Sequence, residues 1–331
     1  MKVLVTGGAG YIGSHLVRRL TEVGHLPVVL DSLRTGSAGA IGDAELIVGD
    51  VRDVGALDAA LTANVDAVIH MAALKSPAES LRDPGLYFDV NVAGTLAVLE
   101  AMRRHGVGVF VYSSSCAVYG MPSRLPIDES APLAPTTPYG ESKLLAERLL
   151  PWYPSIRSAA LRYFNAAGAV DDGSLGEDWG AAINLIPLVL RAALGHAEQV
   201  EVYGTDYPTP DGTAVRDYVH VMDLADAHVA AMERLNAGSG ESITLNLGTG
   251  VGASVAEVIR AVEEVTGRSV PTAIGPRREG DPAAVWADPQ MAHAVLGWRA
   301  RRDLRTIIST AVRWHELHPA GLAQRGAIAR R

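Results

Sequence analysis

Short runs of apolar, often β-branched residues recur along the first half of the chain. They show little alternation with polar residues, which is typical of parallel strands buried on both faces of a sheet. The stretches between them have the spacing of amphipathic helices. The pattern predicts strands at residues 2–5, 27–30, 45–48, 66–70, 109–112 and 158–161, and helices near 12–23, 54–61, 84–104 and 138–150. This alternation predicts an α/β fold with a doubly wound, mostly parallel Rossmann sheet.

After Arg162 the pattern becomes less regular, and Gly, Pro and Asp accumulate at residues 168–180 and 204–212. Further helices are expected near 221–235, 255–266 and 304–317, and short strands near 200–203 and 242–246. These elements indicate a smaller, mixed α/β C-terminal lobe. We therefore predict a first domain over residues 1–165 and a substrate lobe over 166–331, with some segments crossing back. The tail after His318 is expected to be held loosely.

Composition and charge narrow the class of protein. Of 331 residues, 48% are hydrophobic and 20% are charged, as is usual for a globular protein in water. The net charge of −8 argues against a general nucleic-acid surface, and an anionic ligand would need clustered arginines. A single cysteine, Cys116, excludes an intrachain disulfide, so we expect a reducing compartment, the cytoplasm. No signal-peptide pattern or long apolar run predicts contact with a membrane.

A glycine-rich turn follows the first predicted strand and opens the first predicted helix. Gly7 would allow the tight turn, Gly10 the close approach of a pyrophosphate, and Gly13 close packing of helix on strand. Asp31 follows Gly13 by 18 residues, where a carboxylate would accept ribose hydroxyls and repel a 2′-phosphate. The pattern favours NAD as cofactor, although the nearby Arg34 leaves NADP open and a βα turn without a ligand is the simpler alternative.

Tyr139 and Lys143 are four residues apart, so both side chains leave the same face of the predicted helix. Pro138 suits the first turn of that helix. An ammonium ion beside a phenol stabilises the phenolate, so we expect the pKa of Tyr139 to fall from about 10 towards neutral pH. Tyr139 is thus a candidate general base, although a surface tyrosine and a solvated lysine would show the same spacing. The chain has only three lysines among its 29 basic residues, which makes a lysine at this position notable.

With both motifs in view, the chain resembles the extended short-chain dehydrogenase/reductase family, and within it the UDP-glucose (UDP-galactose) 4-epimerases. The resemblance covers nearly the full length. Besides the glycine turn, it rests on the strings at residues 70–75, 113–120, 139–143, 162–165, 211–226 and 277–281.

The resemblance implies an NAD-dependent enzyme that inverts C4 of a UDP-hexose through a transient 4-keto sugar. Its implied catalytic residues are Ser115, Tyr139 and Lys143. Its implied cofactor contacts are Gly7, Gly10, Tyr11, Ile12, Gly13, Asp31, Lys75, Asn91, Tyr139, Lys143 and Tyr163. Asp50 and Val51 follow the third predicted strand and could bind the adenine edge, with an ordinary turn as the alternative. Its implied substrate contacts are Lys75, Ser115, Asn165, Asn184, Tyr203, Arg216, Arg278, Asp281 and Val285. It implies no metal and a homodimer formed through the helices near 84–104 and 138–150.

Neighbouring activities differ at single positions. Sugar-nucleotide 4,6-dehydratases carry an Asp–Glu pair where this chain has Cys116 and Ala117, and neither residue can supply that acid and base. In the family, the residue before Trp286 gates the sugar pocket, and here it is the small Val285, which predicts acceptance of UDP-N-acetylglucosamine as well. A UDP-pentose 4-epimerase, a dehydrogenase that releases NADH and a non-catalytic NAD-sensing protein remain as alternatives.

Overall fold

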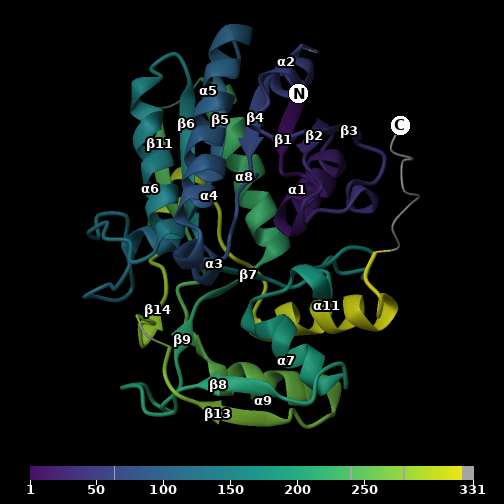
Figure 1. Ribbon diagram of the computed structural model, residues 1–331, viewed down its shortest axis with the longest axis vertical. Coiled ribbons are helices and arrows are strands. Elements are labelled where there is room, and N and C mark those ends of the chain that lie inside the picture. The colour runs from purple at the N-terminus through teal and green to yellow at the C-terminus, as the bar shows by residue number, and fades with distance from the viewer. Residues whose placement is uncertain (63, 239–240, 279, 323–331) are drawn as a thin grey trace.

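The computed structural model describes residues 1–62, 64–238, 241–278 and 280–322. At its centre is a parallel sheet of seven strands in the order β11-β6-β5-β4-β1-β2-β3 (Figure 1). The strands are β1 (Lys2–Thr6), β2 (Leu26–Asp31), β3 (Glu45–Val48), β4 (Ala67–His70), β5 (Val109–Ser115), β6 (Arg157–Tyr163) and β11 (Ile243–Leu247). The doubly wound Rossmann sheet is confirmed, as are the six strands predicted for it. Because β1 lies between β2 and β4, the strand order reverses at the turn that follows β1.

One strand of this sheet comes from the later part of the chain, some segments of which were predicted to cross back. The strand predicted near residues 242–246 was assigned to the C-terminal lobe, but β11 pairs in parallel with β6 and forms one edge of the main sheet. Its apolar residues Leu245 and Leu247 are fully buried there. Pairing with β11 satisfies the backbone groups of β6, which would otherwise be exposed at an edge.

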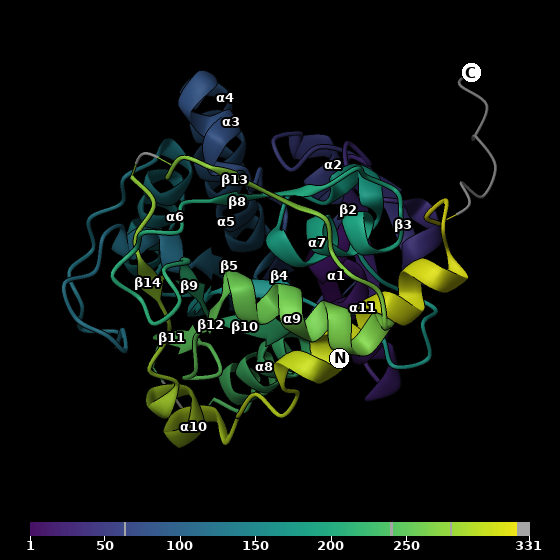
Figure 2. The ribbon, with the colours of Figure 1, turned by 90° about the horizontal axis from the view of Figure 1, so that it is seen from below.

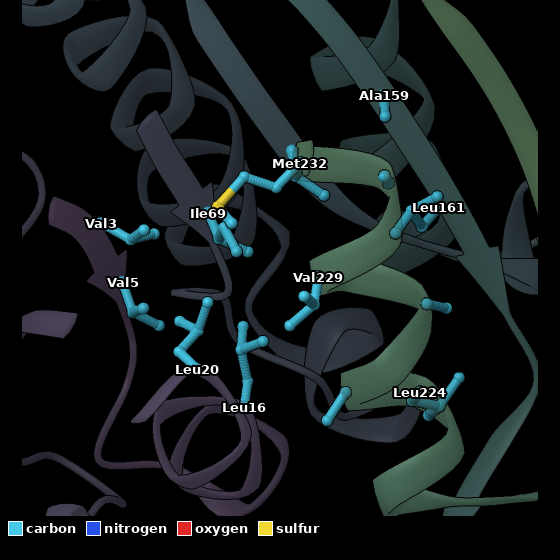
Figure 3. Close-up of a cluster of buried hydrophobic side chains, with 14 of the residues drawn as sticks. Val3, Val5, Leu16, Leu20, Ile69, Ala159, Leu161, Leu224, Val229 and Met232 are labelled. Atoms are coloured by element: carbon cyan, nitrogen blue, oxygen red, sulfur yellow. The ribbon is translucent and has the colours of Figure 1, made fainter. Parts of the chain in front are cut away.

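Helices cover both faces of the sheet. On one face, α1 (Tyr11–Glu22) packs against α8 (Val221–Asn236), and Figure 3 shows Leu16 and Leu20 of α1 pointing toward Val229 of α8. On the other face lie α2 (Val54–Leu61), α5 (Gly94–His105) and α6 (Pro138–Leu149). The sequence also placed α8 in the C-terminal lobe, whereas its apolar face completes the core of the first domain.

The long helix expected at residues 84–104 is interrupted. After α3 (Pro77–Arg82), the chain forms α4 (Pro84–Phe88), a π-helical segment (Asp89–Ala93) and then α5 without a break. Such π segments often occur at functional sites. Here the segment carries Asn91, whose side chain is buried.

The C-terminal part packs around a core of its own. Its helices are α7 (Leu185–Ala193), α9 (Val255–Thr266) and α11 (Leu304–Leu317), and Figure 2 shows α9 and α11 side by side. Its small sheets pair β8 (Val200–Tyr203) with β13 (Thr272–Gly275), and β9 (Val215–Arg216) with β12 (Ala253–Ser254) and β14 (Ala284–Val285). Helix α10 (Gln290–Leu296) returns to the first domain.

The parallel pair β7 (Asn165–Ala167) and β10 (Tyr218–His220) joins the two parts. Short 3₁₀ turns lie at Ala38–Ile41, Cys116–Tyr119, Leu150–Trp152 and Trp179–Ala181. The division at residues 165/166 stays a prediction, and most of the tail predicted to be loose, residues 323–331, lies outside the described residues. Within the described chain, no helix has both the length and the apolar composition needed to cross a bilayer.

Candidate active site at the carboxyl edge of the sheet

The turn after β1 has the geometry of a phosphate cradle. Gly7 has a φ of +72°, and a Cβ there would lie 2.5 Å from the backbone nitrogen of Ala72. A Cβ on Gly13 would lie 2.2 Å from the Gly7 carbonyl oxygen, so neither position accepts a side chain. Gly10 is the N-cap of α1 and supplies no capping side chain. The first backbone amides of α1 are therefore left to an anion, as the pyrophosphate of a dinucleotide requires.

Asp31 stands beside this turn, at the end of β2. Its carboxylate is buried and accepts hydrogen bonds from the backbone N–H groups of Ala9 (2.9 Å) and Leu33 (2.8 Å). Burial raises the pKa of Asp31, and these two amide bonds oppose that shift. The carboxylate is thus fixed next to the glycine turn, which suits recognition of ribose hydroxyls.

The remaining cofactor candidates line the same edge of the sheet. Asp50 is held by Arg52, which lowers its pKa, and Val51 packs under Gly94. The amide of Asn91 bonds both backbone groups of Leu74 and donates to the Ser142 hydroxyl (2.9 Å).

Two further cofactor candidates bond a later segment of the chain. The Tyr11 hydroxyl donates to the Gly168 carbonyl (2.6 Å), and the Lys75 ammonium pairs with Glu177 (3.0 Å). Ile12, in the first turn of α1, packs against the hydrophobic core.

Ser115, Tyr139 and Lys143 meet at the ends of β5 and α6. Thr137 caps α6, so the helix starts at Pro138 and holds Tyr139 and Lys143 one turn apart. Ser115 is the last residue of β5 and lies within hydrogen-bonding reach of the Tyr139 phenol. The Lys143 ammonium is buried, donates to the Ser113 carbonyl (2.7 Å) and lies 5.1 Å from the centre of the Tyr112 ring.

The pKa of Tyr139 differs from the prediction. Burial raises it above its ordinary value of 10.0, nearby Tyr163 adds to the rise, and the hydrogen bond with Ser115 opposes it. Burial also lowers the pKa of Lys143 to about 7, against which Glu147 acts. The prediction considered the attraction between the two groups and omitted the larger cost of removing both from water. The phenol is therefore protonated in the protein alone, and additional positive charge is needed for it to act as a base.

A buried network surrounds this site, and the sequence analysis missed most of it. Glu147 is one turn beyond Lys143, accepts from the Ser114 hydroxyl (2.5 Å) and pairs with the buried Arg162 of β6 (2.5 Å). The Ser113 hydroxyl bonds Tyr163 (2.5 Å). The three consecutive serines of β5 thus each serve a different partner. The spacing of four that joins Tyr139 to Lys143 continues to Glu147, and this signal could have revealed it.

The substrate candidates form two groups. In the first, Arg216 pairs with Asp281 (2.5 Å), Val285 is buried one strand away in β14, and the Asn165 amide donates to the Asp217 carbonyl (3.0 Å).

In the second group the Arg278 guanidinium lies 3.8 Å from the centre of the Tyr203 ring. Asn184, the N-cap of α7, makes no side-chain capping bond.

Cys116 connects the first substrate group to the catalytic residues. Burial raises the pKa of its thiol to about 12, while nearby Arg216 acts to lower it. Cys116 packs against the apolar cluster that contains Val285, and Val285 pairs with Arg216 between β14 and β9. Within the described residues, no group of three or more His, Cys, Asp or Glu side chains is placed to hold a metal ion.

Comparison with known proteins agrees with this geometry. The model of the NAD dependent epimerase/dehydratase family matches residues 3–248. The chain belongs to this family. It is 47% identical to a UDP-glucose 4-epimerase of Halalkalibacterium halodurans over 97% of each chain. The resemblance inferred from the motifs is thereby confirmed.

Solved structures give the same result. A UDP-glucose-4-epimerase of Stenotrophomonas maltophila, with bound NAD and formylated UDP-arabinopyranose, superimposes with a TM-score of 0.93 at 44% identity, covering 96% of this chain and 99% of that one. The UDP-Glc/GlcNAc 4-epimerase of Campylobacter jejuni superimposes with a TM-score of 0.83 at 36% identity, covering 96% and 99%.

Proposed function

We propose that this protein is an NAD-dependent epimerase that inverts C4 of a UDP-hexose, such as UDP-glucose or UDP-galactose. The observation that carries the proposal is the meeting of Ser115, Tyr139 and Lys143 at the sheet edge that also holds the glycine turn and Asp31. A base beside a dinucleotide site is the arrangement needed to oxidise a secondary alcohol.

The chain's own residues handle the proton. Bound NAD would accept the hydride from C4 and return it to the opposite face, and its positively charged nicotinamide would favour the Tyr139 phenolate. Tyr139 takes the proton of the 4-hydroxyl, and Ser115 donates a hydrogen bond to the same oxygen. Lys143, buried, fixed by Ser113 and one helical turn from Tyr139, adds positive charge to the site.

The two substrate groups suit the nucleotide. A protein of net charge −8 needs local cations to hold a diphosphate, and Arg216 and Arg278 supply them. Asp281 would accept the uridine ribose hydroxyls, and the Tyr203 ring would cover the uracil. Asn165 and Asn184 would bond the nucleotide, and Lys75 and Asn91 would line the sugar and nicotinamide pocket.

The small side chain of Val285 extends the proposal to UDP-N-acetylglucosamine. Val285 lies in a buried apolar cluster with Phe164, and a valine leaves more room for an N-acetyl group than an aromatic ring would. The relative from Campylobacter jejuni is named for both sugars, which supports this extension. Wild-type protein is expected to turn over both UDP-sugars, and failure with the N-acetyl sugar would remove this part of the proposal.

The proposal also includes the cellular compartment and the oligomeric state of the protein. We expect a cytoplasmic enzyme because the chain has one cysteine, and a homodimer through α5 and α6 because the family resemblance implies it.

The deciding experiment incubates purified protein with single UDP-hexoses and no added cofactor, and identifies products by chromatography. The expected result is the 4-epimer without accumulation of NADH, whereas steady NADH release would indicate a dehydrogenase. Tyr139→Phe should lose about 10²–10⁴-fold in turnover and keep its NAD. Tyr153→Phe is the matched control, because that hydroxyl bonds Glu100 at the surface, and it should behave as wild type. Near-normal turnover by Tyr139→Phe would refute the proposed role.

A further inference from the structure

Residues 168–178 connect β7 to the 3₁₀ turn at Trp179–Ala181. In Figure 1 this teal segment lies between α1 and α11. Two residues of the predicted dinucleotide site bond its two ends. They are Tyr11, one residue after the N-cap of α1, and Lys75, which follows β4.

At the first end, the Tyr11 hydroxyl donates to the Gly168 carbonyl at 2.6 Å. Gly168 has a φ of +92°, and a Cβ there would lie 2.8 Å from the His220 ring. The backbone of Gly168 is therefore fixed against β10, and the bond to Tyr11 ties that fixed point to the start of α1.

At the second end, the Glu177 side chain is 6% exposed and pairs at 3.0 Å with the Lys75 ammonium, whose side chain is 45% exposed. The Glu177 carbonyl accepts from the Trp314 indole (3.1 Å), so the backbone here is anchored to α11. Glu177 thus joins the C-terminal helices to the cofactor edge of the sheet. A buried carboxylate loses its hydration, and Lys75 compensates for that loss.

Between these ends, the contacts of the segment contribute less to holding it in place. Arg18 of α1 pairs with Asp172 (2.9 Å) and donates to Ser174 (2.7 Å), but these side chains are largely exposed. Exposed pairs contribute little because water and salt screen them. The buried contact at Glu177 is therefore the stronger attachment to test.

We propose that residues 168–178 form a strap that closes the dinucleotide site and slows the release of NAD, and that Glu177 is the positioning residue that fastens the strap through Lys75. The proposal rests on the proposed function only in taking NAD as the ligand. It deepens that function, because a cofactor that is regenerated in every cycle gains from slow release. The ion pair between Glu177 and Lys75 must break before NAD can leave its site.

The test measures release of NAD from purified protein in the absence of any sugar. Protein loaded with NAD is diluted, and the nucleotide that remains bound is quantified over time by an enzymatic cycling assay. Glu177→Gln keeps an oxygen that can accept from the Lys75 ammonium but removes the negative charge that pairs with it, and it should release NAD about tenfold faster, because charge-assisted bonds are roughly twice as strong as neutral ones. Glu177→Asp, which keeps the charge but shortens the side chain, should also release NAD faster. Asp178→Asn is the matched control in the same segment, since its carboxylate bonds the Leu322 amide instead, and its rate should stay within about twofold of wild type.

A second measurement tests whether faster release of NAD comes from loss of the Glu177–Lys75 pair or from general damage to the fold. Because one pair carries the effect, Lys75→Met with Glu177→Gln should release NAD no faster than the faster single variant. If the two substitutions multiply each other's effect on the rate of NAD release, the strap is refuted. The strap is also refuted if Glu177→Gln releases NAD no faster than wild type. Release of NAD is read without turnover, so a protein that retains NAD but does not epimerise sugars refutes the proposed function and leaves the strap standing.

Discussion

The buried carboxylate of Asp217 gives the sharpest prediction for the substrate side of the site. Its side chain is fully buried, and its two oxygens accept from the Thr249 amide (2.9 Å) and hydroxyl (2.6 Å), the Gly250 amide (3.3 Å) and the Ala287 amide (3.2 Å). Its own backbone N–H donates to the Val285 carbonyl (3.1 Å). Asp217 therefore ties the loop after β11 and the end of β14 to β10.

Asp217→Asn changes one acceptor oxygen to an NH₂ group. If the amide oxygen keeps the Thr249 donors, the NH₂ group faces the Gly250 and Ala287 amides, which are also donors. Each buried donor left unpaired costs about 1–3 kcal/mol, so the free energy of unfolding should fall by about 2–6 kcal/mol. That is a large share of the roughly 5–15 kcal/mol that stabilises a typical domain.

The assay is urea unfolding of the NAD-loaded protein at a fixed NAD concentration. The free energies of unfolding of wild type and variant are compared with the same slope of free energy against urea concentration for both. Asp288→Asn is the control, because its exposed oxygen bonds the Gln290 amide and an asparagine can accept the same bond. The control should stay within about 0.5 kcal/mol of wild type. Folded Asp217→Asn protein should also show a raised KM for UDP-sugar, since Arg216 is its chain neighbour. A stability loss below about 1 kcal/mol would refute the reasoning.

Two further predictions use single buried side chains. Val285→Tyr should lower turnover of UDP-N-acetylglucosamine relative to UDP-glucose by about 10–200-fold, as steric changes in a pocket do, and an unchanged ratio of the two activities would exclude Val285 as the gate. Arg162→Met leaves the buried Glu147 without its cation and should lower the free energy of unfolding by about 3–5 kcal/mol, measured by urea unfolding. Arg103→Met, which breaks an exposed pair with Glu100, should cost less than about 1 kcal/mol, and equal losses in the two variants would contradict the role of burial.

The sequence by itself determined the first domain and the chemical groups of its site. Apolar runs without alternation predicted β1 to β6, because strands buried on both faces leave that local pattern. The glycine turn could also be predicted from the sequence. Gly7 and Gly13 must be glycines because a side chain there would collide with residues nearby in the chain or at the end of the adjacent strand. The spacing of Tyr139 and Lys143 is local to one helix, so it too survived in the structure.

Tertiary structure decided which segments and side chains these groups contact and how far they are exposed to water. Periodicity reports that α8 and β11 are apolar on one side, but not which core they join, and the structure places both in the first domain. The bonds of Glu177 to Lys75 and of Asp217 to Thr249 join segments distant in sequence. The pKa of Tyr139 rises because burial outweighs the hydrogen bond with Ser115, and burial depends on which segments pack together in space.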